Sequence, residues 1–279
     1  MLDRKVKVKE IRDLGSRNYL LTLNASEQAN LTRPGQFFML KCVERIDENP
    51  LLRRPLSAFN IHRHPRSDKP TGLDFLVKDV GSGTHKLATL MPGAEIYCLG
   101  PQGHCFQAPF ETQSRSTRAY LVAGGVGIAA LYLLAQQLIS QNVKPALIYG
   151  GRNAGDLVLR EYFERLGIET AYTTEDGSCG ERGVVTLPLE RLLKVNGRRE
   201  ARIYACGPWG MMKAIHELAL RYHLPCDVSL EARMGCSLGA CMGCVIRASD
   251  DKGKSQYIRV CQEGPVMSSR IVDWETHPI

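Results

Sequence analysis

Residues 231–261 read EARMGCSLGACMGCVIRASDDKGKSQYIRVC and form the most informative stretch of the chain. The stretch holds four cysteines in the pattern C-x4-C-x2-C, with sixteen residues before the fourth: Cys236, Cys241, Cys244 and Cys261. Plant-type [2Fe–2S] clusters are bound by the same ligand pattern. Glycines stand between or beside the ligands, where a side chain would crowd the inorganic core: Gly235, Gly239 and Gly243. The spacing therefore predicts a [2Fe–2S] site on these four cysteines, with the last one supplied by a strand at 257–260.

A structural zinc site is the alternative interpretation of the same four cysteines. Zinc also takes four thiolates, but most often from two C-x2-C pairs. This chain has one compact triplet and one distant cysteine. The spacing favours an iron–sulfur cluster, and zinc stays open as the alternative.

Composition and charge exclude several classes of protein. The chain has 279 residues, 44% hydrophobic and 23% charged, as expected for a globular protein with two domains and perhaps a small third. Its apolar runs are too short to span a membrane, and the first fifteen residues lack the apolar core of a signal peptide. Ten cysteines in such a chain indicate a reducing compartment, so we expect a cytoplasmic location. The net charge of +7 comes without a basic run interleaved with aromatic residues, which argues against nucleic-acid binding.

Short strands separated by Gly and Pro fill the first 110 residues, a pattern typical of a small antiparallel barrel. We expect strands at 6–11, 18–23, 36–40, 72–80 and 95–99. The extended segment R-P-L-S lies among them and consists of Arg54, Pro55, Leu56 and Ser57. Its guanidinium could bind the pyrophosphate of a flavin nucleotide, and its hydroxyl could reach the flavin ring. A simple β-bend with a surface arginine is the alternative, because this short motif is common.

A second segment strengthens the prediction of a flavin site. Residues 76–87 read LVKDVGSGTHKL, which predicts a strand, a G-S-G-T turn and a helix. Gly83 and Thr84 at the helix start would place backbone N–H groups and a hydroxyl where a phosphate can bind. The alternative is that Thr84 is an ordinary helix N-cap.

The middle of the chain has the pattern of a nucleotide-binding α/β domain. A buried strand at 118–123 leads into GGVGIAA and a long apolar helix, so that Gly125 and Gly127 form a loose dinucleotide fingerprint in the required strand–turn–helix context. The positive end of that helix would face a diphosphate. Strands at 145–150, 169–173 and 202–205 and helices at 156–166 and from about 209 complete a parallel sheet.

The turn Cys206-Gly207-Pro208 follows the last of these strands, at the sheet edge where a nicotinamide could bind. A buried cysteine at a Gly-Pro turn is the alternative for Cys206. No acidic residue ends the second strand, and Arg152 stands nearby instead. An acid there would favour NAD and an arginine could suit NADP, so the pattern leaves the choice open.

Taken in order, the motifs R-P-L-S, G-S-G-T, G-G-V-G-I-A and C-G-P resemble those of the ferredoxin–NADP reductase superfamily. With the four-cysteine segment added, nearly the whole chain resembles the PyrK family, the electron-transfer subunits of class 1B dihydroorotate dehydrogenase. The segments TEDGS at 174–178, EARM at 231–234 and CQEGPV at 261–266 are also similar to that family. The basic segment at 63–69 is not accounted for by the resemblance.

The resemblance implies a β + α/β fold with three parts. These are an antiparallel FAD-binding β-barrel at 1–112, a parallel-sheet NAD-binding α/β domain at 113–225 and a small C-terminal [2Fe–2S] subdomain at 226–279. By motif, FAD contacts would fall on Arg54, Pro55, Leu56, Ser57, Leu76, Val77, Lys78, Gly83 and Thr84. NAD would contact Gly125, Gly127, Cys206, Gly207 and Pro208. The cluster ligands would be the four cysteines above.

The resemblance also implies a partner, an FMN-containing catalytic subunit that oxidises dihydroorotate, in a heterotetramer of two copies of each subunit. Electrons would pass from FMN through the [2Fe–2S] cluster and FAD to NAD+, in pyrimidine biosynthesis. A flavin belongs between the cluster and NAD because it exchanges electrons singly or in pairs. No acid–base residue is expected to be catalytic. Two alternatives stay open: a flavin/iron–sulfur subunit of another NAD(P)-linked ferredoxin or sulfide oxidoreductase complex, and a zinc-stabilised adaptor without redox activity.

Overall fold

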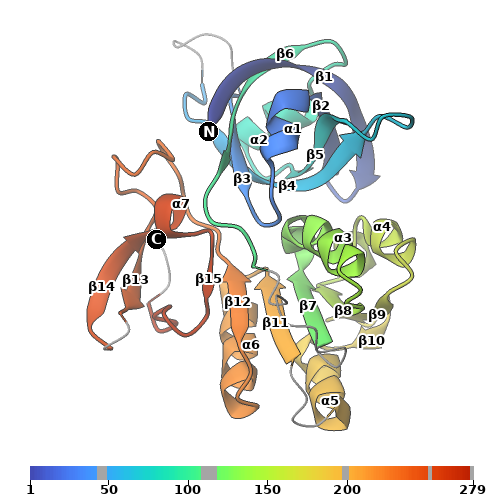
Figure 1. Cartoon of the computed structure of the whole chain (residues 1–279), viewed down its shortest axis with the longest axis vertical. Helices are drawn as coiled ribbons and strands as arrows, with labels where there is room; N and C mark the ends of the chain where they lie inside the picture. The colour runs from blue at the N-terminus through green and yellow to red at the C-terminus, as the bar shows by residue number, and fades with distance from the viewer. Residues whose placement is uncertain (43–48, 108–117, 197–200, 251–252, 277–279) are drawn as a thin grey trace.

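The computed structural model describes residues 1–42, 49–107, 118–196, 201–250 and 253–276. Figure 1 shows a barrel at the top, a sheet flanked by helices below it, and the C-terminal segment beside both. This arrangement confirms the predicted combination of an antiparallel barrel and a parallel-sheet domain. No helix among the described residues is long and apolar enough to cross a membrane.

The barrel is closed by six antiparallel strands in the order β1-β2-β5-β4-β3-β6. The strands are β1 (Leu2–Gly15), β2 (Asn18–Asn24), β3 (Phe37–Leu40), β4 (Arg54–Arg63), β5 (Pro70–Lys78) and β6 (Glu95–Gln102). Alternate side chains such as Leu21, Leu23 and Phe75 point inward and are fully buried. Phe38 meets Phe75 edge-on at a ring separation of 5.3 Å, so aromatic packing fills the centre of the barrel.

Two short helices belong to the barrel, α1 (Ser26–Leu31) and α2 (Ser82–Ala88). The sequence patterns did not predict α1. The helix α2 begins two residues before Thr84, so the alternative that Thr84 is its N-cap is wrong. The Thr84 hydroxyl instead accepts hydrogen bonds from the backbone N–H groups of Val80 and Gly81, at 2.9 and 3.1 Å. That hydroxyl therefore holds the G-S-G-T turn in shape.

The second sheet has seven strands in the order β10-β9-β8-β7-β11-β12-β15. Its strands are β7 (Arg118–Gly124), β8 (Pro145–Gly151), β9 (Glu169–Thr174), β10 (Glu181–Arg182), β11 (Ala201–Cys206), β12 (Cys226–Ser229) and β15 (Val266–Ser268). All pairs are parallel except β12–β15. Tyr120 and Val122 pack with α5 (Thr186–Asn196) and α6 (Trp209–Arg221), whereas Leu121 packs on the opposite face with α3 (Tyr132–Ser140). Helices thus cover both faces, as expected for parallel strands.

Two predicted helices differ from the observed ones. The glycine-rich turn leads first into a 3-10 helix, η1 (Gly125–Ala130), and only then into α3. The predicted helix at 156–166 is replaced by η2 (Ala154–Asp156) and α4 (Arg160–Glu164). The Asn153 side chain accepts the Gly155 N–H and forms a turn, and Leu159 has a left-handed φ of 61°, which interrupts the helix.

The C-terminal part consists of a hairpin, β13 (Val245–Ser249) and β14 (Ser255–Arg259), followed by the one-turn helix α7 (Val260–Glu263). The strand predicted at 257–260 is observed as β14, which ends at Arg259, and Cys261 lies on α7 immediately after it instead of on the strand. The Glu263 carboxylate accepts the Arg259 N–H at 2.8 Å, which bends the chain into a helical turn.

The predicted domain boundary at 225/226 cuts through the large sheet, because β12 and β15 both pair into it. The 112/113 boundary lies outside the described residues, and the three domain ranges stay a prediction.

Apolar cores join the barrel to both other parts of the chain. Phe37 and Met39 of the barrel share a core with Cys244, Cys261 and residues of the second sheet. On the other side, Phe59 stacks on Tyr132 with ring centroids 4.8 Å apart and meets Tyr162 edge-on at 5.0 Å. The barrel is thus packed against both the nucleotide-type domain and the C-terminal part.

We expect Phe59→Ala to lower the free energy of unfolding by about 3–5 kcal/mol, because it empties the aromatic contact between barrel and α3. Denaturant unfolding measures the change. Met91→Ala is the control, since Met91 is 71% exposed and its loss should cost no more than about 0.5 kcal/mol. Equal effects of the two substitutions would contradict a packed junction at Phe59.

Candidate functional site

Three of the four cysteines of the 231–261 stretch lie in one loop, and Cys261 lies on α7, after the β13–β14 hairpin. Cys241 is exposed and Cys236 half-buried, whereas Cys244 and Cys261 are buried. Backbone N–H groups of Leu238 and Cys241 point at the Cys236 sulfur, at 3.3 and 3.4 Å. Hydrogen bonds from the Cys241 and Leu238 amides lower the pKa of the Cys236 thiol to about 6. The loop is therefore built to stabilise a thiolate.

The cysteine side chains influence one another's ionisation. Cys241 acts on Cys236 and on Cys244, and Cys261 acts on Cys244. Burial, together with the neighbouring Cys261, raises the pKa of Cys244 to about 11. In the part of the chain that the structure describes, no three His, Cys, Asp or Glu side chains surround a single metal position. Four thiolate ligands from this loop and α7 suit a [2Fe–2S] cluster, which is held by four cysteines.

Unusual backbone angles shape the loop. Ser237, Gly239 and Met242 have φ values of 56°, 81° and 57°, in the left-handed region that turns successive amides toward one side. Two side chains from α7 and its flank hold the loop in place, and sequence reasoning gave neither of them a role. Gln262 donates to the Ser237 carbonyl at 3.1 Å, and Arg259 donates to the Gly239 carbonyl at 3.3 Å.

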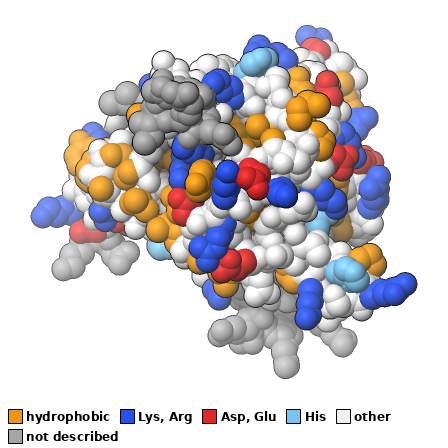
Figure 2. Space-filling model, turned by 90° about the horizontal axis from the view of Figure 1, so that it is seen from above, with side chains coloured by type: hydrophobic (Ala, Val, Ile, Leu, Met, Phe, Trp, Pro, Cys, Tyr) orange, Lys and Arg blue, Asp and Glu red, His pale blue; other side chains and the backbone are white. Residues whose placement is uncertain are grey.

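The exposed edge of this loop is apolar. Leu238 and Met242 flank Cys241 and are 54% and 50% exposed, and Tyr257 on β14 is 69% exposed. Figure 2 shows hydrophobic side chains gathered on the left of the molecule, the side on which Figure 1 places the C-terminal part. Exposed apolar side chains gathered in one place mark an interaction surface.

The two predicted flavin segments come together on the barrel. The Arg54 guanidinium lies over Gly83, so closely that a Cβ at Gly83 would be 2.5 Å from its Nε. Pro55, Leu56 and Ser57 follow along β4 and are partly exposed. R-P-L-S and G-S-G-T therefore form one surface, as a shared phosphate site requires.

The side chains of the third predicted flavin segment, residues 76–78, lie in different surroundings. Leu76 and Val77 are buried, so they can offer a flavin only their backbone. The Lys78 side chain points away from the barrel toward the second sheet, where its Nζ lies 2.9 Å from Asp156.

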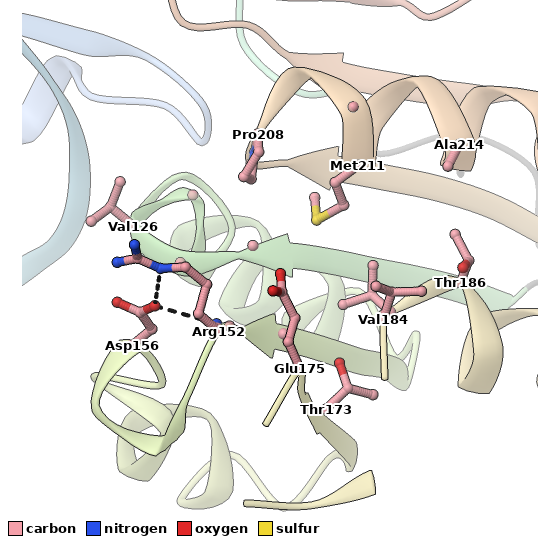
Figure 3. A pocket seen from close by; sticks show the side chains of 18 of the residues that line it. Val126, Arg152, Asp156, Thr173, Glu175, Val184, Thr186, Pro208, Met211 and Ala214 are labelled. Atoms are coloured by element: carbon pink, nitrogen blue, oxygen red, sulfur yellow. Dashed lines mark hydrogen bonds and ion pairs between the residues drawn. The ribbon is translucent and has the colours of Figure 1, made fainter. Parts of the chain in front are cut away.

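A cavity of about 550 Å³ opens where the barrel faces the carboxyl ends of the parallel strands (Figure 3). The predicted residues Gly125, Gly127, Gly207 and Pro208 line it. A Cβ at Gly127 would overlap the Cys206 carbonyl, so glycine lets η1 pack onto the end of β11. Cys206 itself is buried behind this wall, and burial raises the pKa of its thiol.

Five charged side chains also line the cavity: Lys78, Arg152, Asp156, Glu175 and Glu231. Sequence reasoning had considered Lys78 for FAD and Arg152 for NADP, but it gave the three acidic residues no role. The Arg152 Nε lies 3.1 Å from Asp156, and Glu175 also attracts its charge. Burial raises the pKa of the Glu231 carboxyl. Sequence reasoning could have identified Glu175 as a cavity residue, because it directly follows β9 and ligands bind at the carboxyl ends of parallel strands.

Comparisons with protein families match both the cysteine loop and the domain that carries the cavity. Residues 231–273 match the iron–sulfur cluster binding domain of dihydroorotate dehydrogenase B, and residues 121–217 match the oxidoreductase NAD-binding domain. The chain is 34% identical over 270 residues to the "Dihydroorotate dehydrogenase B (NAD(+)), electron transfer subunit" of Desulforamulus reducens, across 96% of this chain and 97% of that one. It is 37% identical over 257 residues to the protein of that name from Geobacillus thermodenitrificans, across 91% and 92%.

Solved structures agree on the fold. An NADH-dependent reduced ferredoxin–NADP oxidoreductase superposes with a TM-score of 0.80 at 26% identity, over 97% of this chain and 90% of that one. The ferredoxin reductase of carbazole 1,9a-dioxygenase gives a TM-score of 0.64 at 21% identity, over 80% and 67%. These matches confirm the predicted reductase fold, and the family matches confirm the iron–sulfur and NAD predictions. A chain that aligns over nearly its full length with these relatives and carries both domains belongs to the family of electron transfer subunits of dihydroorotate dehydrogenase B.

Proposed function

We propose that this chain passes electrons from the FMN of a dihydroorotate dehydrogenase catalytic subunit to NAD+, through its own [2Fe–2S] cluster and FAD, in pyrimidine biosynthesis. The position of β4 supports the proposal. Its Pro55 and Ser57 pair with Met39 and Phe37 of β3, and those two side chains share a core with Cys244 and Cys261. The flavin segment thus lies beside a barrel strand whose buried side chains belong to the same core as two of the cluster ligands.

The residues of the chain suit each group that the proposal names. When bound, the cluster carries single electrons, NAD carries a hydride pair, and the flavin exchanges either. The loop amides around Cys236 favour thiolate ligands, and Arg54 above Gly83 offers a cation to a pyrophosphate. Gly125 and Gly127 open the start of η1 to a dinucleotide. We assign FAD contacts to the nine barrel residues predicted from the motifs, and we place Cys206 behind the NAD site.

We further propose that the cavity selects NAD over NADP. Arg152 stands at its rim but is balanced by Asp156 and Glu175. A ribose 2′-hydroxyl can donate to the Glu175 carboxylate, whereas a 2′-phosphate would be repelled by it. The names of the relatives point to NAD+ as well.

The partner subunit would dock on the apolar edge of the cluster loop, because one-electron transfer requires the cluster close to its donor. Cys241 is the exposed ligand there, between Leu238 and Met242. We propose that the partner is the FMN-containing catalytic subunit, that two copies of each chain form a heterotetramer, and that the assembly is cytoplasmic.

A second candidate is a flavin/iron–sulfur subunit of another NAD(P)-linked ferredoxin or sulfide oxidoreductase complex. The likeness to the ferredoxin–NADP oxidoreductase structure favours it. Dihydroorotate-dependent reduction of NAD+ by the assembled complex would distinguish the two.

Cys241→Ser should abolish NAD+ reduction by dihydroorotate in the assembled complex, because it removes an exposed cluster ligand. NADH oxidation by an artificial acceptor should survive, since that reaction needs only FAD and the NAD cavity. Steady-state assays of both reactions measure the difference. Cys105→Ser is the control, because Cys105 lies outside the loop. Full dihydroorotate activity in Cys241→Ser, or loss of both reactions, would contradict the separate roles.

The double variant Leu238→Glu/Met242→Glu should weaken binding of the catalytic subunit at least about thirtyfold, an effect the size of an interface hot spot. Analytical ultracentrifugation measures the affinity and the mass of the complex, which should equal two copies of each chain. Val195→Glu is the matched control, because Val195 is 83% exposed on α5. Unchanged affinity, with cluster absorbance retained, would place the partner elsewhere.

Glu175→Gln should raise the Kd for NADH about tenfold, as expected for losing a hydrogen bond to a charged group, and should leave the Kd for NADPH equal or lower. Flavin-fluorescence titration measures both constants. Glu169→Gln, at the opposite end of β9, is the control. If Glu175→Gln changed the Kd values for NADH and NADPH by the same factor, Glu175 would not distinguish a ribose 2′-hydroxyl from a 2′-phosphate.

A further inference from the structure

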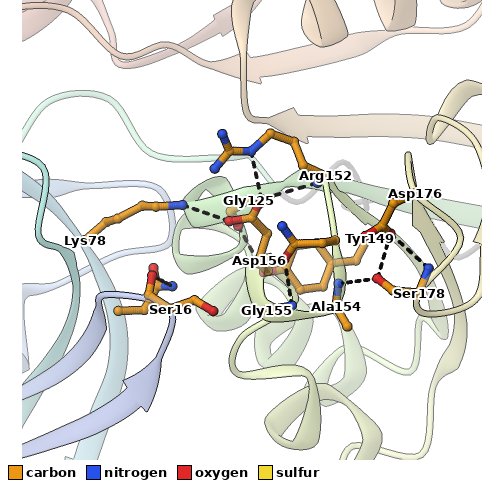
Figure 4. Close-up of polar contacts among 12 residues, drawn as sticks. Ser16, Lys78, Gly125, Tyr149, Arg152, Ala154, Gly155, Asp156, Asp176 and Ser178 are labelled. Carbon is orange, nitrogen blue, oxygen red and sulfur yellow. Dashed lines mark hydrogen bonds and ion pairs between the residues drawn. The ribbon is translucent and has the colours of Figure 1, made fainter.

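A buried carboxylate joins the barrel to the nucleotide-binding domain. Asp156 on η2 accepts a hydrogen bond from Lys78 Nζ at 2.9 Å, and Lys78 is the last residue of the barrel strand β5. The same carboxyl group accepts the Arg152 N–H at 3.3 Å and the Arg152 Nε–H at 3.1 Å. Figure 4 shows the three side chains meeting where the two domains face each other.

The pair is well shielded from solvent. The Asp156 side chain is 9% exposed and that of Lys78 26%, whereas Arg152 is 71% exposed. Burial opposes ionisation of Asp156, but the hydrogen bonds from Lys78 and Arg152 outweigh it and lower the pKa of the carboxyl. A second ion pair across the boundary, Arg12–Glu161, is longer at 3.9 Å and has both side chains more than 40% exposed. Asp156 therefore anchors Lys78 in the more protected part of the junction.

Neighbouring contacts fix η2 to both sides of the junction. The Tyr149 hydroxyl lies 2.8 Å from the Asp156 carbonyl and 3.1 Å from the carbonyl of Gly125, the first residue of the dinucleotide turn. Ser16, in the barrel turn between β1 and β2, packs so closely on Gly155 that a Cβ there would overlap the Ser16 hydroxyl. That barrel turn is tied to the residue after Lys78, because Asp79 N–H donates to the Arg17 carbonyl at 2.8 Å. One continuous set of contacts thus runs from the barrel to the dinucleotide turn.

We propose that Asp156 is a positioning residue that sets the spacing and angle between the bound nicotinamide and the flavin by holding Lys78 of the barrel against η2 of the nucleotide-binding domain. The inference rests on the proposed function, since it assumes FAD on the barrel and NAD in the cavity. Hydride transfer is sensitive to such geometry, and a misplacement of about 1 Å can cost a hundredfold in rate. Lys78 and Asp156 both line the cavity, so their contact lies beside the place where the two cofactors must meet.

The test is Asp156→Asn in the full chain loaded with FAD and cluster. Stopped-flow reduction of FAD at saturating NADH should slow at least about tenfold, whereas the Kd for NADH should change less than about threefold. Asp156→Glu should recover much of the rate, because it restores the charge. Lys78→Met should slow the reaction from the barrel side, and the double variant should be no slower than the slower single variant, as expected for two residues that act as a unit.

A structural readout accompanies the rates and does not depend on turnover. Hydrogen exchange in Asp156→Asn should rise in the barrel turn around Ser16, which belongs to the other domain. The matched control is Asp227→Asn, which breaks the pair with Arg202 inside one sheet. The exposed fractions of that pair, 26% and 10%, are nearly those of Lys78 and Asp156. Asp227→Asn should leave both the rate and the exchange of the barrel turn unchanged.

The outcomes separate this inference from the proposed function. If wild-type FAD is not reduced by NADH, the proposed function itself fails. If wild-type FAD is reduced and Asp156→Asn behaves like Asp227→Asn, the positioning role is wrong. A variant that raises only the Kd for NADH also overturns it, because Asp156 would then serve binding. Should Asp156→Asn fail to fold, Lys78→Met with the same two readouts decides the question.

Discussion

Packing of the barrel against two partners at once is the constraint on which the rest of the structure depends. Phe59 packs on Tyr132 and Tyr162 of the nucleotide-binding domain. Phe37 and Met39 belong to the core that the barrel shares with the second sheet and the C-terminal hairpin. Electron transfer between carriers needs fixed short distances more than acid–base groups. Apolar cores supply that fixity over a wide area, because close-packed side chains allow little relative movement.

Polar contacts and close backbone approaches then fix the local geometry of the parts that the apolar cores hold together. Amides directed at Cys236 favour a thiolate, glycine at 127 allows η1 to meet β11, and Asp156 connects Lys78 with Arg152. Each of these features depends on direction, which apolar packing alone does not provide. The same logic explains the exposed, apolar edge of the cluster loop, because one ligand must come within reach of another protein.

Much of the fold could be predicted because the patterns that indicate it lie in residues close together in the sequence. Alternating apolar residues predicted the barrel strands, strand–glycine–helix patterns predicted the parallel sheet, and the cysteine spacing predicted the cluster loop. Helix limits were less well predicted. The helix at 156–166 broke into two because Asn153 forms a turn and Leu159 adopts a left-handed angle, choices that depend on packing around Val158 and Phe163. Cys261 moved onto α7 for a similar reason, the Glu263 contact with Arg259.

The contacts between distant segments were beyond sequence reasoning. Nothing in the spacing of Lys78 and Asp156 shows that they meet, since 78 residues separate them. Glu231 and Glu175 become neighbours of the dinucleotide turn only through the sheet order. Arg54 was predicted to bind a phosphate, but its place over Gly83 required the closed barrel.

One chain should hold both a flavin and a [2Fe–2S] cluster that NADH can reduce. An absorption spectrum of the anaerobically purified protein, before and after NADH, measures this most directly. We expect flavin bands with a broad sulfide-to-iron charge-transfer shoulder, both bleached by NADH. Flavin bands alone, with zinc found by metal analysis, would contradict this expectation and would assign the four cysteines to a structural site.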